Sequence, residues 1–162
     1  MNLNANKYKN IIENLHEGII ILNEDLNIIY LNNFIIDLLN TKESKSINSS
    51  FLDLLDEKNS KTFNNMLINI EKNNTCDLKL KVDKQFIFLR LSISTYNENN
   101  NNYYVCVCED ISNIHRDEVV KSCIYKISEA IHDVDDLQSL YKEIHYIISE
   151  VTNTNNFYIA LV

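Results

Sequence analysis

The feature that most constrains the fold is a change in hydrophobic period near residue 75. Apolar residues occupy every second position from Cys76 to Val82 and again from Ile87 to Ile93, with Asp83-Lys84 between the two segments. A period of two is typical of a strand with one buried face, and two such strands joined by a short connection predict a hairpin. An antiparallel sheet is therefore expected.

Three further segments have the character of strands. Residues 18–22 and 28–31 are aliphatic runs joined by the turn-forming Asn23-Glu24-Asp25, which predicts a second hairpin. Residues 103–109 predict a fifth strand, and the asparagine tract before it, residues 98–102, predicts a loop.

Short helices are predicted before and between the hairpins. They are expected at residues 1–16, after a capping Asn32 or Asn33, at residues 51–55, and after Ser60 as the N-cap of a longer helix. The order of strand, strand, helices and three strands predicts an α+β domain, with a five-stranded antiparallel sheet and helices on one face, followed by long helices.

The amino-acid composition limits the possible binding partners and the cellular compartment of the protein. The chain has 15 basic and 23 acidic residues, and its formal net charge of −8 argues against nucleic acid, because a phosphate backbone attracts clustered Lys and Arg. Four cysteines are too few for a disulfide scaffold and favour a reducing cytoplasm. No apolar run reaches the ~20 residues that span a bilayer, so a soluble protein with no membrane partner is expected. One glycine and no proline leave Asn and Asp to fill left-handed turn positions.

The last third of the chain predicts two helices and a strand. A coiled-coil spacing of four and three residues connects Val120, Ile124, Ile127, Ile131 and Val134. It predicts a connector helix at residues 113–134 that pairs in a parallel homodimer. Residues 137–151 have a second amphipathic pattern, and residues 157–162 are an apolar run typical of a strand without a visible partner.

Three motifs carry a family resemblance. Glu17-Gly18-Ile19-Ile20-Ile21-Leu22, Ile29-Tyr30-Leu31-Asn32 and Asp110-Ile111-Ser112 are similar to the opening strand, the second strand with its helix-capping Asn, and the closing Asp-Ile-Thr motif of PAS sensor domains. The resemblance covers residues 8–112 and places a PAS domain at residues 17–112. Ile114 stands where the family usually has a basic residue, so the usual ion pair of the motif is not implied.

A second resemblance follows at residues 124–162, which look like the beginning of a GAF domain, another sensor class. Residues 137–151 correspond to its first long helix and residues 156–161 to its first strand, so the GAF-like part, residues 135–162, is expected to be incomplete. PAS and GAF domains in this order typically precede a histidine kinase or a cyclic-dinucleotide enzyme. The resemblance therefore implies a cytoplasmic sensory piece of a signalling protein, such as a two-component system.

A cavity between sheet and helices would be lined by Phe63, Met66, Leu89 and Tyr104, and such apolar walls favour an uncharged or weakly anionic small molecule. A cavity there would favour a sensor, whereas a solid core would favour a scaffold that only holds two chains together. The resemblance argues against two cofactors. Residues 51–72 lack the Cys that forms a covalent flavin adduct, and residues 60–72 lack the axial His of haem-binding relatives.

Other chemically reactive residues have plainer interpretations. Cys106 and Cys108 are expected as small core residues rather than metal ligands. The four histidines are expected to face solvent or to pack on helices: His16, His115, His132 and His145. A single glycine excludes a Gly-rich phosphate loop and a nucleophile elbow, so no catalytic activity is expected.

Alternation along residues 86–94 places Arg90 on the outer sheet face with Phe86 and Phe88. This Phe pair either marks an interface or is covered by the N-terminal helix.

Overall fold

The computed structural model describes residues 3–42, 46–72, 74–82, 85–133 and 136–151. The chain divides into two compact units, residues 1–112 and 113–162. The first unit contains, in chain order, α1 (Leu3–Glu13), β1 (Gly18–Leu22), β2 (Ile28–Leu31), α2 (Asn33–Leu38), the 3₁₀-helix η1 (Phe51–Leu54), α4 (Glu57–Ile68), β3 (Thr75–Val82), β4 (Gln85–Glu98) and β5 (Asn101–Asp110).

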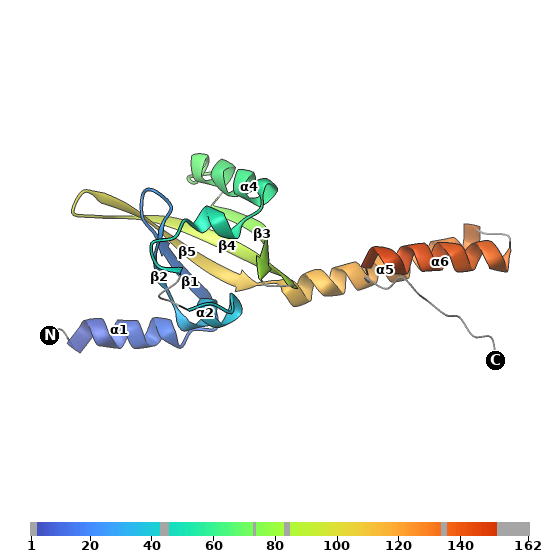
Figure 1. Ribbon diagram of the computed structural model, residues 1–162, viewed down its shortest axis with the longest axis horizontal. Helices are drawn as coiled ribbons and strands as arrows, with labels where there is room; N and C mark the ends of the chain where they lie inside the picture. The colour runs from blue at the N-terminus through green and yellow to red at the C-terminus, as the bar shows by residue number, and fades with distance from the viewer. Residues whose placement is uncertain (1–2, 43–45, 73, 83–84, 134–135, 152–162) are drawn as a thin grey trace. The chain divides into compact units, whose positions relative to one another are not determined.

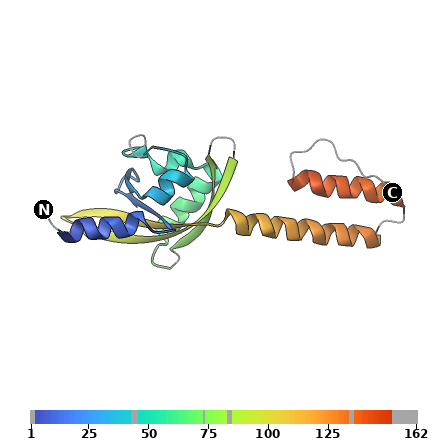
Figure 2. The same cartoon turned by 90° about the horizontal axis from the view of Figure 1, so that it is seen from below.

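The strands form one antiparallel sheet in the order β2-β1-β5-β4-β3 (Figure 1). Helices α2, η1 and α4 lie on one side of it (Figure 2). The predicted five-stranded α+β fold is confirmed. The core lies between the sheet and these helices and is formed by alternate strand residues and by helix residues that include Ile20, Leu22, Ile35, Phe51, Phe63, Met66, Leu78, Leu80, Leu89, Leu91, Ile93, Cys106 and Cys108.

The single glycine of the chain lies where the side chain of Ile35 on α2 packs against β1. A Cβ atom at Gly18 would overlap the side chain of Ile35 on α2 and would lie 3.0 Å from the Cβ of Cys108 on β5. Every other residue type would therefore require the Ile35 side chain or α2 itself to shift.

Two predicted boundaries are wrong. α4 begins one turn before Ser60, because the Asp56 carboxylate accepts a hydrogen bond from the Asn59 backbone N–H at 2.8 Å and so caps the helix earlier. The asparagine tract is not a loop, since β4 and β5 remain paired out to Glu98 and Asn101. Only Asn99 and Asn100 turn the chain, with φ of 51° and 66°. Two positive φ values suit a two-residue hairpin, and Asn takes the place that Gly usually fills.

Both edges of the sheet are covered by the segment that connects α2 to α4. At the β2 edge, the backbone of Ile28 donates to Ser49 at 2.9 Å and accepts from Asn48 at 2.8 Å. At the β3 edge, Leu55 pairs with Leu80 in an isolated bridge. Another strand that pairs at Ile28 or at Leu80 would have to displace these contacts. The strand predicted at residues 157–162 lies outside the described residues.

Asn32 fixes the junction between α1, β1 and α2. Its side chain has no exposed surface. Its Oδ1 accepts from the N–H groups of Ile19 at 2.9 Å and Ile35 at 3.3 Å, and its Nδ2 donates to the carbonyls of Ile12 at 3.1 Å and Glu17 at 2.9 Å. The predicted cap of α2 is thus Asn32, and it also holds the end of α1.

α1 does not cover the outer Phe residues. Its apolar residues Tyr8 and Ile11 are 63% and 52% exposed, and Phe86 is 54% exposed. The alternative in which the N-terminal helix folds over this Phe pair is therefore wrong within the described chain.

The second unit contains α5 (Ser112–Asp133), whose first residue still belongs to the first unit, and α6 (Leu137–Val151). Ala130 of α5 and Ile147 of α6 are buried, and the Cys123 Sγ lies 4.0 Å from the carbonyl oxygen of Ile147, so the two helices pack together. Most of the predicted coiled-coil seam is not covered by this contact, because Val120, Ile124 and Ile131 are 46%, 62% and 56% exposed. Val134 lies outside the described residues.

Among the described residues, no helix is both long and apolar enough to cross a membrane.

Candidate functional site

A groove of about 450 Å³ lies between α4 and the start of β3. Its lining consists of Thr62, Asn65, Met66, Asn69, Lys72 and Cys76. The polar residues of α4 follow one another at helical spacing beside the core-facing Met66, which is only 4% exposed. The groove therefore has a polar rim and an apolar floor of Met66 and Cys76, and it suits a small molecule of mixed character.

The four predicted pocket residues belong to one cluster. Phe63 and Leu89 have no exposed surface, Met66 is nearly buried, and Tyr104 is partly buried at the border of the same core. The ring of Phe63 also lies 5.0 Å from that of Phe51, centroid to centroid. Met66 alone of the four also lines the groove, so it connects the core to this opening. That the four hold a ligand remains a prediction.

The polar rim of the groove was not found from the sequence. Its signal is the spacing of Thr62, Asn65 and Asn69 along one side of α4. Two of these residues also bond within their own stretch of chain, since the Thr62 hydroxyl donates to the Lys58 carbonyl at 3.1 Å and the Asn69 amide to the Asn65 carbonyl at 2.9 Å. Such spacing is ordinary on an exposed helix and does not by itself indicate a site.

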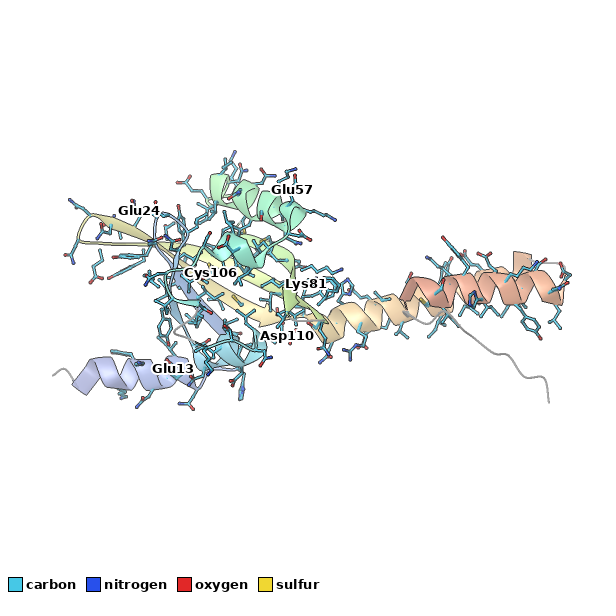
Figure 3. The ribbon with its side chains drawn as sticks, in the orientation of Figure 1. Glu13, Glu24, Glu57, Lys81, Cys106 and Asp110 are labelled. Carbon is cyan, nitrogen blue, oxygen red and sulfur yellow. The ribbon has the colours of Figure 1, made fainter. Side chains whose placement is uncertain are left out.

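Three cysteine side chains lie on the core-facing side of the sheet. Cys76 and Cys108 both pair with Leu91, one from each side. Cys106, which is labelled in Figure 3, lies two residues from Cys108 on β5. Removal from water raises the pKa of Cys76 to about 11 and that of Cys106 to about 12, and it raises the pKa of Cys108 as well. These thiols are therefore protonated and poorly nucleophilic at neutral pH.

No metal site emerges from the part of the chain that the structure describes, where no three His, Cys, Asp or Glu side chains are grouped to hold an ion. His16, His132 and His145 are exposed and His115 is half-buried. Both cysteines predicted as core residues, Cys106 and Cys108, are fully buried.

The closing motif of the first unit is bonded to β4. The Ile111 N–H donates to the Phe88 carbonyl at 2.8 Å, and the Phe88 N–H donates to the Ser112 hydroxyl at 2.9 Å. The carboxylate of Asp110, labelled at the end of β5 in Figure 3, accepts from the Ser112 N–H at 2.9 Å. The start of α5 is thus held by the backbone of β4, the strand that pairs directly with the groove-lining β3.

The outer face of the sheet near this exit carries a charged cluster. Arg90 donates to both carboxylate oxygens of Asp77, at 2.9 and 3.1 Å, and lies 3.8 Å from the Glu109 carboxylate. The Lys79 Nζ lies 3.9 Å from the ring centroid of Phe86. Arg90 faces outward, as the alternation predicts, and its side chain is 45% exposed, so these pairs contribute little to stability.

The architecture, an antiparallel sheet with short helices on one face and a helix leaving its last strand, is that of a PAS domain. The PAS fold family matches residues 6–111 of this sequence, which is more than half of the chain. The chain therefore belongs to the PAS fold family. No curated protein matches it.

Solved structures with the same fold include three PAS domains. One from Colwellia psychrerythraea has a TM-score of 0.60 and 13% identity, and covers 67% of this chain and 98% of its own. One from a two-component sensor histidine kinase has a TM-score of 0.59 and 12% identity, and covers 67% of this chain and 96% of its own. That of nitrogen regulation protein NR(II) from Vibrio parahaemolyticus has a TM-score of 0.53 and 17% identity, and covers 68% of this chain and all of its own. At these identities the likeness establishes the fold alone.

Proposed function

We propose that this chain is a non-catalytic cytoplasmic sensory module, in which the PAS domain senses a small molecule or a partner and passes its state through α5 to a following domain. The observation that carries the proposal is the bonding of Ile111 and Ser112 to Phe88, because any displacement of β4 then acts directly on the first turn of α5. The resemblance of residues 135–162 to a GAF domain supports a second sensor domain next in the chain, with a histidine kinase or a cyclic-dinucleotide enzyme as the output.

The groove is the proposed point of entry for the signal. Met66 forms its floor and packs in the same cluster as Phe63, Leu89 and Tyr104, so a ligand that enters there displaces Met66 first. Lys72 on the rim favours a weakly anionic or an uncharged molecule. A ligand that prefers one packing of α4 against β3 would shift the population toward that packing, and differential affinity for two states is all that signalling requires.

Homodimerisation through α5 is the second part of the proposal. Val120, Ile124 and Ile131 present an apolar stripe to solvent although α5 already packs on α6 through the neighbouring residues Cys123 and Ala130. A matching stripe on a second copy, in a parallel coiled coil, would remove this surface from water.

A plain dimerisation scaffold without a ligand is the alternative. The complete burial of Phe63 and Leu89 favours it, because a core filled by its own side chains leaves a ligand little room.

Thermal denaturation with small-molecule extracts of the host distinguishes the two functions. A ligand at 100 times its Kd stabilises the folded state by about 2.7 kcal/mol and raises Tm. Thr62→Trp should abolish the shift by filling the groove, whereas Lys61→Trp, next to it on α4 but outside the groove lining, should keep it. No extract-dependent shift in the unmodified chain would favour the scaffold.

A further inference from the structure

Asn59 connects α4 to the edge of the sheet. It lies in the first turn of α4 and is only 9% exposed. Its Oδ1 accepts from the backbone N–H of Lys79 on β3 at 3.0 Å, and its Nδ2 donates to the Asp56 carboxylate at 2.8 Å. A carboxylate can only accept, so Asp56 fixes which end of the Asn59 amide faces β3.

Lys79 and Phe88 are direct partners across the β3–β4 ladder. The Lys79 N–H points away from β4 to Asn59, and the Phe88 N–H and carbonyl point away from β3 to Ser112 and Ile111. This rung of the ladder therefore has a helix side chain bonded at each of its two ends.

The two acceptors come from the starts of different helices. Asn59 is the third residue of α4 and Ser112 is the first residue of α5. In Figure 3, Glu57, Lys81 and Asp110 mark the three elements involved, namely the start of α4, strand β3 and the end of β5. A displacement of α4 along β3 must therefore either break the bond to Lys79 or move the rung to which α5 is attached.

We propose that Asn59 is the positioning residue that couples α4 to α5 through the Lys79–Phe88 rung. This inference rests on the proposed function, because it specifies how a change at the α4 groove reaches the exit helix. Asp56 orients the amide of Asn59 by accepting its hydrogen bond. Hydrogen bonds from the backbone and side chain of Asn59 also hold the pKa of the Asp56 carboxyl below its ordinary value.

Amide hydrogen exchange of the full chain without ligand, followed by NMR, tests the coupling. In Asn59→Ala the Lys79 amide should exchange ~5–10-fold faster because it loses its acceptor, and the Phe88 amide on the far side of the rung should also exchange at least ~3-fold faster. Thr62→Ala, on the same helix but with its hydroxyl bonded within α4 to the Lys58 carbonyl, should change neither amide. Ser112→Ala should in turn accelerate exchange at Lys79, because coupling is reciprocal.

The exchanged pair Asp56→Asn/Asn59→Asp separates positioning from simple structural damage. In the double variant the amide now at position 56 still caps α4, the carboxylate now at position 59 still offers an acceptor to the Lys79 N–H, and the amide donates to the carboxylate, with the net charge unchanged. The exchanged pair should therefore restore the protection of the Lys79 and Phe88 amides from exchange. Unchanged Phe88 exchange in Asn59→Ala would overturn the coupling, as would failure of the exchanged pair to restore it. Either result would leave ligand binding and dimerisation standing, because no ligand is present and neither variant touches the α5 stripe.

Discussion

Replacement of the only glycine, Gly18→Ala, tests the packing of α2 on the sheet. The added methyl group overlaps the side chain of Ile35 and comes within 3.0 Å of the Cβ of Cys108. Overpacking of this kind costs about 1–3 kcal/mol. Alanine also makes the unfolded chain less flexible than glycine does, which stabilises the folded state by about 0.4–1 kcal/mol. The net loss of unfolding free energy should therefore be about 1–2 kcal/mol.

Urea unfolding of the full chain, followed by circular dichroism, measures this loss, and a double-mutant cycle assigns it. Ile35→Val removes one of the two overlapping carbon atoms and costs about 0.5–1.5 kcal/mol by itself. In the double variant the effect of Gly18→Ala should fall by about 1 kcal/mol, because the methyl group then has room. As a control, Ser94→Ala at an exposed position of β4 should change the unfolding free energy by no more than about 0.5 kcal/mol. A neutral Gly18→Ala, or strict additivity with Ile35→Val, would refute the packing argument.

Three further outcomes are expected. Ile124→Asp should weaken self-association at least ~10-fold in sedimentation velocity, since a seam carboxylate must be desolvated, and unchanged association would contradict the coiled coil. The pKa of Asp56 is lowered from 3.8 by hydrogen bonds from the first turn of α4, so the stability that this carboxylate contributes is present above pH 3.8 and lost as the pH falls through its folded-state pKa. The difference in unfolding free energy from Asp56→Ala should thus shrink in acid, and a pH-independent difference would exclude this role. At pH 8, iodoacetamide should alkylate Cys76 about 100-fold more slowly than a thiol of pKa 9.0, and it should alkylate Cys106 and Cys108 only after unfolding. Mass spectrometry of the labelled peptides measures these rates. Rapid labelling of Cys106 in the folded protein would contradict its burial.

The strand pattern was predictable because alternation is a local property. Leu78, Leu80, Leu89 and Leu91 each occupy the face that the period of two assigns to them. The start of α4 was not predictable, since Asp56 and Ser60 are both residue types that favour an N-cap. The structure shows Asp56 as the N-cap, and the sequence alone does not distinguish between the two.

The asparagine tract misled for a different reason. A low-complexity run predicts a loop by composition, but pairing from Tyr96–Tyr103 to Glu98–Asn101 extends the hairpin to a two-residue turn. The rings of Tyr96 and Tyr103 stack with centroids 6.4 Å apart, a cross-strand contact that depends on register and is invisible to composition.

Of the residues that line the groove, only Met66 was among the pocket residues expected from the sequence. Met66 follows from helical spacing with Phe63, whereas the rim residues Thr62, Asn65 and Asn69 have no distinguishing pattern. The coupling role of Asn59 depends on its bond to Lys79, which is twenty residues away in the sequence and is brought close only by the path of the chain.

Native mass spectrometry of residues 1–162, expressed in and purified from the host, tests the central claim most directly. The account predicts twice the 19.0 kDa mass of one chain, together with an added small-molecule mass that is lost on denaturation. A dimer without added mass would favour the scaffold. A monomer of 19.0 kDa without added mass, at high micromolar concentration, would contradict both the sensory module and its dimer.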